Sequence, residues 1–517
     1  MKWITLRGLT FRHAERTVMD NREPLMRSDW TIYRGGAVFF NGAEDCALED
    51  SFIDQVGGNA VFVNNYNRRI AIRGTQIAKA GANGICFIGD PQSARSPLFN
   101  YYHTQDLEKI DRTPGPKSDN YPADCLVEDC LIYLTGRVEK QTAGVQIDLA
   151  QSITVRHCSI YDLPRAGINI GSGCWGGHVI EWCDIFDTVK ETGDHGSFNS
   201  WGRDRFWRPN IGEVNAWVKQ APELPMLDVV KPIVLANNRW RCDHGWDIDL
   251  DDGSSHYVIT NNLCLNGGIK LREGYGRVVE NNVLVNNGGH PHVWYAECAD
   301  IFRRNIVWAE YQPAHMPSRP WGKEMNFNLM HDANATTNQP AMRLQQLSGR
   351  DEQSIVADAQ FIDSARGDYR VKYSSPALKL GFVNFAMDRF GVQKPEFKAI
   401  ARMPELPGIK ESTPRAVTRA DDPVTWLAAS VRNITGAGEM SAFGLPGVTG
   451  VLVLEVPAES PLARAGLHKN DVILSVSGGK TADTAALLKQ STASPGGNSL
   501  KLGVSRDQKE IVLELIR

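Results

Sequence analysis

Short runs of alternating apolar and polar residues recur along the first three hundred residues. Each run begins with an apolar residue, followed by two mostly polar residues and, in fourth place, a small or amide residue. Two further residues, the last of them apolar, complete the run. Where no insertion interrupts the repeat, successive fourth positions lie 20 to 28 residues apart. The runs are LEDSFI (48–53), VEDCLI (127–132), VRHCSI (155–160), IEWCDI (180–185), LANNRW (235–240), ITNNLC (259–264), VENNVL (279–284) and FRRNIV (302–307), with IRGTQI (72–77) and LRGLTF (6–11) fitting more loosely.

A repeat of this length, made of short β runs without helical periodicity, predicts a solenoid. We therefore expect a mostly β chain that forms a right-handed parallel β-helix, with neighbouring coils stacked ~4.8 Å apart. The fourth positions then form columns. Asn238, Asn262, Asn282 and Asn305 would make an asparagine ladder, and Cys130, Cys158 and Cys183 would stack as small buried fillers in the same column.

A second set of strands follows the turns and carries the candidate chemistry. Alternation predicts that their apolar residues face the core, Trp246 among them. The other face runs from Phe62, Cys86 and Ile88 in the early coils to polar residues in the later ones. The predicted outward residues of these later strands are Gln146, Asp148, Asn169, Phe198, Ser200, Asp247, Asp249, Lys270, Arg272 and Trp294.

The stretch HGWDIDLDDGS (244–254) concentrates carboxylates on this face. Asp247 and Asp249 would lie beside Lys270 and Arg272 of the next coil. This arrangement has two interpretations: cross-strand salt bridges alone, or a groove where acidic and basic groups converge on a ligand. Long insertions at 91–123 and 202–231 would frame the same face, and such loops on a rigid scaffold often carry function.

Composition excludes several classes of protein. The net charge of −4 gives no basic excess for nucleic acid, and no apolar run approaches the ~18 residues of a membrane span. The ten cysteines contain no Cys-x-x-Cys pair, so we expect no structural zinc site. The chain starts directly in a strand pattern, WITLRGLTF, so we expect that an upstream segment precedes Met1.

The composition changes near residue 395. We expect a β-helix over 1–395, a linker rich in proline and charge over 396–430, and a second domain over 431–517. SPLARAGL and NDVILSVSG within 444–478 resemble a bacterial PDZ domain. The resemblance implies capture of a peptide C-terminus, by strand addition beside the helix predicted at 481–490. Its carboxylate-binding loop would lie near Phe443–Pro446, although Pro446 removes one backbone donor; a purely structural domain is the alternative.

Three further motifs resemble β-helical glycoside hydrolases, most closely glycoside hydrolase family 141. They are GDHGSFNSWGRDRFW (193–207), GWDIDLDDGS (245–254) and GIKLREG (268–274), and the likeness covers about residues 1 to 395. The resemblance implies cleavage of glycosidic bonds in a polysaccharide or oligosaccharide, of the α-L-fucosidase or xylanase type, in the periplasm or outside the cell. It implies two catalytic aspartates: Asp204, and either Asp247 or Asp249.

Glycosidic hydrolysis needs a proton donor and a second carboxylate, and like charges raise a carboxyl pKa so that one of a cluster can act as the acid. No cofactor is expected for this chemistry. The residues that we expect to contact the substrate are Asp148, Asn169, His195, Trp201, His244, Lys270, Arg272, Glu273 and Trp294.

Two other functions fit the same residues. In a polysaccharide lyase, Lys270 or Arg272 would remove a proton next to a uronic carboxylate, and the aspartates would bind Ca²⁺. In a glycan-binding solenoid the face would bind sugar without turnover.

Overall fold

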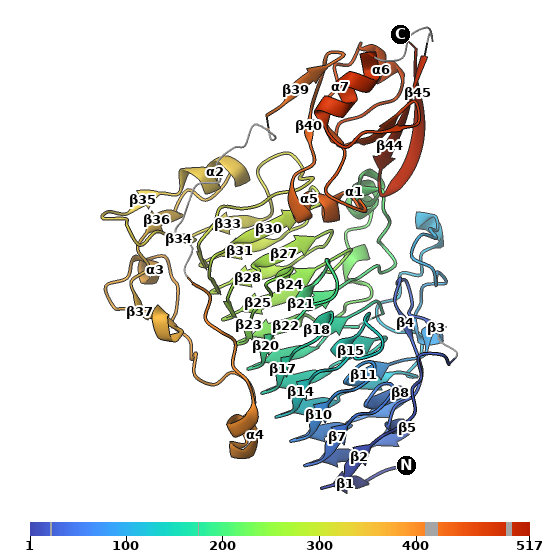
Figure 1. Ribbon diagram of the computed structural model, residues 1–517, viewed down its shortest axis with the longest axis vertical. Helices are drawn as coiled ribbons and strands as arrows, with labels where there is room; N and C mark the ends of the chain where they lie inside the picture. Colours follow the sequence, from blue (N-terminus) through green and yellow to red (C-terminus); the bar gives the residue numbers. More distant parts are fainter. Residues whose placement is uncertain (21–22, 174, 409–421, 493–498, 517) are drawn as a thin grey trace. The chain divides into compact units, whose positions relative to one another are not determined.

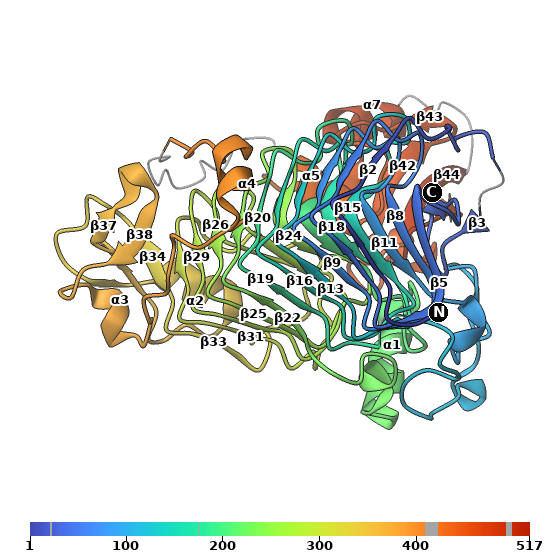
Figure 2. The ribbon, with the colours of Figure 1, turned by 90° about the horizontal axis from the view of Figure 1, so that it is seen from below.

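The computed structural model describes residues 1–20, 23–173, 175–408, 422–492 and 499–516. The chain separates into two compact units. The first unit is a stack of coils whose colours follow the sequence from one end to the other (Figure 1). Most coils contribute a strand to each of three parallel sheets, so the chain forms the predicted parallel β-helix (Figure 2).

The first two sheets hold the strands on either side of the repeated turn. The first sheet consists of β1 (Thr5–Arg7), β6 (Ala47–Glu49), β9 (Ala71–Arg73), β13 (Leu126–Glu128), β16 (Thr154–Arg156), β19 (Val179–Glu181), β22 (Ile233–Ala236), β25 (Tyr257–Thr260), β28 (Val278–Glu280), β31 (Ile301–Arg303) and β33 (Glu324–Asn326). The second sheet consists of β2 (Thr10–Arg12), β7 (Phe52–Asp54), β10 (Gln76–Ala78), β14 (Leu131–Tyr133), β17 (Ser159–Tyr161), β20 (Asp184–Phe186), β23 (Arg239–Trp240), β26 (Leu263–Cys264), β29 (Val283–Leu284), β32 (Ile306–Val307), β34 (Leu329–His331), β36 (Ile355–Ala357) and the antiparallel β35 (Gln339–Pro340).

The third sheet carries the polar face. It consists of β5 (Val38–Glu44), β8 (Val61–Arg68), β11 (Ile85–Ile88), β12 (Pro122–Ala123), β15 (Ala143–Asp148), β18 (Ala166–Ile170), β21 (Gly196–Ser200), β24 (Trp246–Leu250), β27 (Ile269–Arg272) and β30 (Gly289–His292). A hairpin of β3 (Glu23–Pro24) and β4 (Thr31–Ile32) precedes it, and the insertion after β21 contains α1 (Ile211–Gln220).

The asparagine ladder is confirmed. The side-chain amide of Asn262 donates to Asn282 Oδ1 at 3.0 Å, and that of Asn282 donates to Asn305 Oδ1 at 3.0 Å. The ladder continues to Asn328, which was not among the predicted members. The cysteine column is also confirmed: Cys183 is fully buried, and its backbone N–H donates to Asn238 Oδ1. The amides thus satisfy buried backbone groups at each turn.

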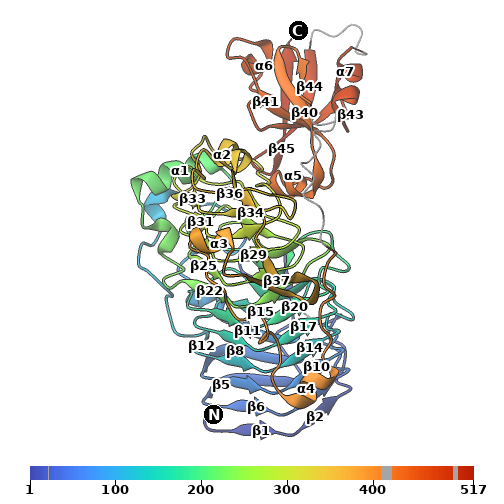
Figure 3. The same ribbon diagram turned by 90° about the vertical axis from the view of Figure 1, so that its left-hand side faces the viewer.

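The C-terminal part of the first unit closes the stack and then runs back along it. β37 (Phe361–Asp363), β38 (Asp368–Val371) and α3 (Pro376–Lys379) cover the core at the last coils, and α2 (Met342–Ser348) precedes them. Residues 389–402, the strap, return along the second sheet and include α4 (Pro395–Ile400), which lies beside the N-terminal coils (Figure 3). Gly391 N–H donates to Trp182 O, Lys394 pairs with Asp50, and Phe397 packs on Leu131 and Phe186.

The predicted linker therefore begins with folded structure, since α4 is packed against the coils. Residues 409–421 of that linker lie outside the described residues. The second unit folds around an antiparallel sheet that already includes β39 (Val424–Trp426) and β40 (Ala429–Asn433). Its other elements are α5 (Gly436–Ala442), β41 (Val451–Glu455), α6 (Pro461–Arg464), β42 (Val472–Val476), β43 (Gly479–Lys480), α7 (Thr484–Thr492), β44 (Ser499–Arg506) and β45 (Lys509–Ile516). No helix of the described residues is long and apolar enough to cross a membrane.

Candidate functional site

Register places two rows of side chains on the outer face of the third sheet. The first row is fixed by the pairing of neighbouring strands, which places Asn169 beside Asn199, Asn199 beside Asp249, and Asp249 beside Lys270. The first row reads Gln146, Asn169, Asn199, Asp249, Lys270 and His290; the second, two residues further along each strand, reads Asp148, Gly171, Trp201, Asp251, Arg272 and His292. The prediction of Phe198 and Ser200 for this face is wrong, because both pair with core residues of β18.

A charged cluster occupies the later half of both rows. Lys270 Nζ lies 3.0 Å from Asp249 Oδ1 and 3.2 Å from Asp251 Oδ1, so one ammonium bridges the two carboxyl groups. Arg272 Nε lies 2.8 Å from Asp252, which also accepts from Arg203 Nε at 3.0 Å. The side chains of Lys270 and Asp249 are 0% and 1% exposed, whereas that of Asp251 is 19% exposed and faces solvent.

The two bridged carboxyl groups differ in protonation. Burial raises the pKa of Asp249 to about 8, and the neighbouring Asp251 adds to the shift while Lys270 opposes it. Burial acts on Asp251 as well, but Lys270, Arg272 and Arg203 together hold its pKa well below its usual range. Burial alone would lower the pKa of Lys270; Asp249 and Asp251 raise it instead, so Lys270 is charged. Near neutral pH the cluster holds one protonated and one ionised carboxyl group on a single cation.

His195 and Glu273, both predicted from the sequence, lie at the edges of this cluster. Glu273 Oε2 accepts from Trp207 Nε1, and burial raises the Glu273 pKa to about 8. His195 Nδ1 lies 3.4 Å from Asp194, whose side chain is 48% exposed, and burial lowers the His195 pKa to about 4. Arg165 Nη2 contacts the same imidazole ring at 2.8 Å.

Trp246 lies on the outer face, so its predicted core position is wrong. The Lys270 ammonium stands 4.3 Å from the centroid of the Trp246 ring, and the indole N–H donates to His290 Nδ1 at 3.3 Å. The cause is a local irregularity of β24, where the N–H groups of Asp247 and Ile248 both donate to Gly268 O. Strict alternation therefore stops at Ile248 and does not extend to Trp246.

The same irregularity turns Asp247 away from the cluster. Its carboxylate accepts from the backbone N–H groups of four turn residues, at 2.7 to 3.1 Å. These donors are Cys242, Asn266, Gly267 and Gly268. Asp247 is fully buried, and burial raises its pKa to about 7 against the effect of these donors. Its position fits a residue that holds two turns together.

Asp204 belongs to a different buried group. Burial raises the pKa of Asp204 well above its usual range, and the nearby Asp228 carboxylate adds to the shift. Its neighbour Arg205 pairs with Asp228 at 3.0 Å and donates to carbonyl oxygens of both insertions, Thr113 O among them. Neighbouring residues of this loop therefore separate: Arg203 joins the charged cluster, Asp204 lies near Asp228, and Arg205 joins the two insertions to each other.

The remaining predicted contacts are spread over the face. Asp148 lies three coils from Asp251 of the charged cluster; it accepts from Gln146, and burial raises its pKa to about 8. Asn169 Oδ1 accepts from Asn199 at 2.8 Å. Trp294 is 2% exposed and donates to Leu271 O, so its ring is not an open platform. The structure places His244 on an exposed turn.

Several cluster members were not predicted as functional residues, namely Asp194, Asn199, Arg203, Asp251, Asp252, His290 and His292. The signal for Asp251 and Asp252 was present in the run DIDLDD (247–252), where the row continues one step past Asp249. His290 and His292 alternate in the sequence GHPH (289–292), and the register places them beside Lys270 and Arg272. Arg203 reaches the face from an insertion, which strand periodicity does not report.

The cluster does not fit a calcium ion. Its carboxyl groups are already paired with Lys270, Arg272 and Arg203, so the site lacks the excess negative charge that a hard divalent cation prefers. Across the described residues, no group of three or more His, Cys, Asp or Glu side chains could hold a metal ion.

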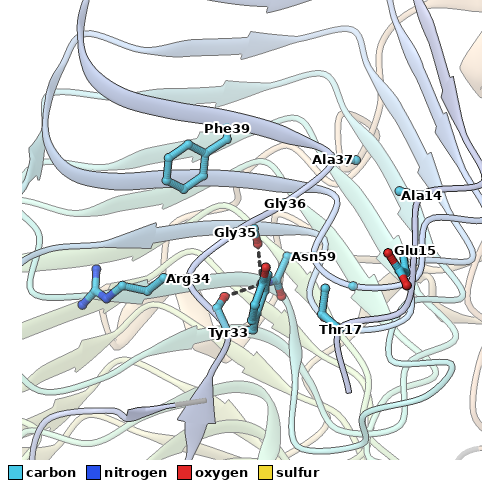
Figure 4. Close-up of a pocket in the computed structure, with 11 residues that line it drawn as sticks. Ala14, Glu15, Thr17, Tyr33, Arg34, Gly35, Gly36, Ala37, Phe39 and Asn59 are labelled. Carbon is cyan, nitrogen blue, oxygen red and sulfur yellow. Dashed lines mark hydrogen bonds between the residues drawn. The ribbon is translucent and has the colours of Figure 1, made fainter. Parts of the chain in front are cut away.

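A separate pocket lies at the N-terminal coils, with a volume of about 330 Å³. Tyr33, Arg34, Phe39 and Asn59 are among its lining residues (Figure 4). The side-chain amide of Asn59 is engaged by the carbonyl oxygens of Tyr33 and Gly35, at 3.0 and 2.9 Å. This pocket contains none of the predicted site residues.

Comparison with known protein families supports the fold of the second unit. Residues 425–516 match the model of the PDZ domain family, and no curated protein matches the chain. Similar solved structures include a glycoside hydrolase, with 15% identity and a TM-score of 0.36 over 52% of this chain and 42% of that one. A mannuronic acid specific polysaccharide family 6 lyase from human gut microbiota has 12% identity and a TM-score of 0.34 over 60% and 62%. A pectate lyase from Paenibacillus sp. 0602 has 11% identity and a TM-score of 0.21 over 72% of each chain.

The chain spans less than two thirds of the length of the first two of these structures. With identities of 15% or lower, their activities do not transfer to this chain. The chain is a mostly β protein, a parallel β-helix followed by a C-terminal PDZ domain.

Proposed function

We propose that the β-helix is a retaining glycoside hydrolase in which Asp249 is the general acid and Asp251 the nucleophile. The observation that carries this proposal is the pair of carboxyl groups bridged by Lys270, at 3.0 and 3.2 Å from its ammonium nitrogen. The pKa of Asp249 is raised and that of Asp251 is lowered, which supports different roles for the two groups. Neighbouring carboxyl groups whose environments separate their pKa values supply the two roles of a glycosidase. Asp251, the more exposed of the two, faces the substrate.

In the first step Asp249 gives its proton to the glycosidic oxygen while Asp251 attacks the anomeric carbon. The bond to the leaving sugar breaks, and a glycosyl ester forms on Asp251. Asp249, now ionised, takes a proton from water, which attacks the same carbon and releases Asp251. Lys270 stays charged throughout and stabilises whichever carboxylate is ionised.

The separation of the two groups supports retention. Asp249 Oδ1 and Asp251 Oδ1 lie 3.0 and 3.2 Å from the same nitrogen, so these two oxygens are close neighbours. A short separation favours the ~5–5.5 Å spacing of retaining enzymes over the ~6.5–9.5 Å that inverting enzymes need to accommodate water. The preferred experiment on this point is NMR of the first-formed anomer, which should keep the substrate's configuration.

The lyase alternative is less well supported. A lysine base must be neutral to accept a proton, yet Asp249 and Asp251 raise the pKa of Lys270, and Arg272 stays charged beside Asp252. The donor set also does not fit calcium, as described above. The sugar, the periplasmic or extracellular location and peptide binding by the PDZ domain remain predictions.

The test is a panel of p-nitrophenyl glycosides, α-L-fucoside first, with xylan and uronan polymers. We expect nitrophenol or reducing sugar from the wild type, and a loss of at least ~100-fold for Asp249→Asn and Asp251→Asn. The Asp249→Asn loss should be larger with poor leaving groups than with dinitrophenyl glycosides, which need little protonation. Asp184→Asn, a buried ion-pair carboxylate of the second sheet, is the matched control and should keep activity. Normal turnover in a folded Asp251→Asn variant, or an unsaturated product from uronan, would contradict the proposal.

A further inference from the structure

One end of the outer face is covered by residues 23–34, the plug, which include the β3–β4 hairpin. Leu25, Trp30 and Ile32 form a buried cluster with outward-facing residues of the third sheet. The sheet residues in this cluster are Phe62, Cys86, Ile88 and Trp201. This contact explains why the outer face is apolar in the early coils, since it is buried beneath the plug.

Two arginines hold the plug at both of its ends. Arg34 donates to Glu23 at 2.6 Å, to Asn64 at 2.7 Å and to Gly89 O at 2.9 Å. Arg27 is 1% exposed, and its side chain donates to Trp207 O at 3.2 Å. The plug is thus joined both to the strands beneath it and to an insertion, as expected for a fixed part of the fold.

The tip of the plug stands next to the charged cluster. The Trp30 ring lies 5.3 Å from the Trp201 ring and 5.8 Å from the His195 ring, and the Arg165 guanidinium stacks over it at 4.9 Å. On the strands between the early coils and β24, the first-row residues Gln146, Asn169 and Asn199 are at most 1% exposed. No open row of polar side chains therefore leads from Asp249 toward the N-terminal coils. Within the charged cluster, the more exposed carboxyl groups are those of Asp251 and Asp194, at 19% and 48%.

We propose that the plug ends the sugar-binding surface beside the charged cluster, so that the enzyme removes sugars from the end of a glycan chain. This inference rests on the proposed glycoside hydrolase function. Coils are stacked ~4.8 Å apart, about the length of one sugar, so binding the interior of a polymer along the sheet needs several uncovered coils on both sides of the cleaved bond. The plug leaves none on the N-terminal side. The substrate class is accordingly a chain end, with its terminal sugar at the partly exposed Asp251 and the plug as the wall behind it.

The test uses the sugar that the p-nitrophenyl panel identifies. Its tri- to hexasaccharides, labelled at the reducing end, are offered with a free and with a chemically blocked opposite end. We expect labelled products that shorten one sugar at a time, and no cleavage of the blocked series. Early labelled products from the middle of the chain, or cleavage of the blocked hexasaccharide, would overturn the inference while leaving the hydrolase intact. Silence on every glycoside in the panel would overturn the proposed function itself.

A pair of variants connects this result to the plug. Trp30→Ala removes the wall next to His195, so the blocked hexasaccharide should become a measurable substrate. Leu25→Ala removes a similar apolar contact within the same buried cluster, away from His195, and should leave the product pattern unchanged. Equal patterns for both folded variants would contradict the role of Trp30. If Trp30→Ala fails to fold, the wild-type product series still decides the inference.

Discussion

Replacing Lys270 by methionine tests the electrostatic account of the site most directly. Methionine keeps the length and apolar stem of the side chain and removes the charge between two buried carboxyl groups. At the observed 3.2 Å, the attraction between Lys270 and the ionised Asp251 is on the order of 5 kcal/mol at an effective dielectric constant near 20. One pKa unit is about 1.4 kcal/mol, so this attraction corresponds to about 3 to 4 units, and we expect the pKa of Asp251 to rise by at least about 2 units.

The ionised form of Asp251 sets the acid limb of the activity profile, because it is the proposed nucleophile. We therefore expect the acid limb of kcat/KM to move upward by about 2 units in Lys270→Met, and Lys270→Arg to restore most of the wild-type profile. The assay is hydrolysis of the best aryl glycoside from pH 2 to 9, because the wild-type acid limb lies below pH 4. Lys109→Met, which breaks an exposed ion pair with Asp106, is the control and should leave the profile in place. An unchanged acid limb in a folded Lys270→Met variant would refute the reasoning.

Three further predictions concern stability, measured by thermal and urea unfolding. Burial raises the pKa of Asp148 in the folded chain to about 8, well above its value in the unfolded chain. The protonated carboxyl group therefore contributes fully to the free energy of unfolding below pH ~4, and this contribution is lost as the pH rises to about 8. Asp148→Asn should therefore become more stable than wild type by several kcal/mol at pH 9 but not at pH 4, and a difference independent of pH would contradict this account. Asn282→Ala breaks the ladder and leaves buried groups unpaired, at a cost of about 2 to 4 kcal/mol, whereas the exposed Asn338→Ala should change stability by less than ~0.5 kcal/mol. Phe397→Ala should cost about 3 kcal/mol because the ring is 8% exposed against the coils, and Ile400→Ala, at 55% exposure, should cost far less; equal costs would contradict the packing of α4.

The repeat was predictable because each coil carries the same short sequence pattern. The fourth-position asparagines recur at coil spacing, and the ladder follows from stacking identical side chains. Asn328 belongs to the run MNFNLM (325–330) and lies 23 residues after Asn305. Its place in the ladder could therefore also have been predicted from the sequence. The PDZ unit was predictable for a similar reason, since its motif lies in one continuous stretch.

The site was only partly predictable because its geometry depends on departures from regularity. Two backbone N–H groups that share Gly268 O move Trp246 onto the outer face and aim Asp247 at a turn, and alternation alone predicts the opposite. Arg203 and Asp204 are adjacent in the sequence, yet their side chains belong to different groups. Arg203 pairs with Asp252 of the charged cluster, whereas Asp204 lies near Asp228. Burial of the early outer face depends on long-range packing of the plug, which no local pattern encodes.

The strap has a consequence for how the solenoid loses structure. In a stack where each coil contacts only its neighbours, opening starts at an end and spreads coil by coil, so the terminal amide protons exchange earliest. The strap joins Asp50, Asp129 and Trp182, which belong to separate coils, through one continuous peptide. Fraying of the coil of Asp50 must first detach Lys394, which removes support from the coils beyond it. The coils under the strap should therefore exchange as one cooperative block, while the coils that it does not span keep the graded protection of an ordinary repeat.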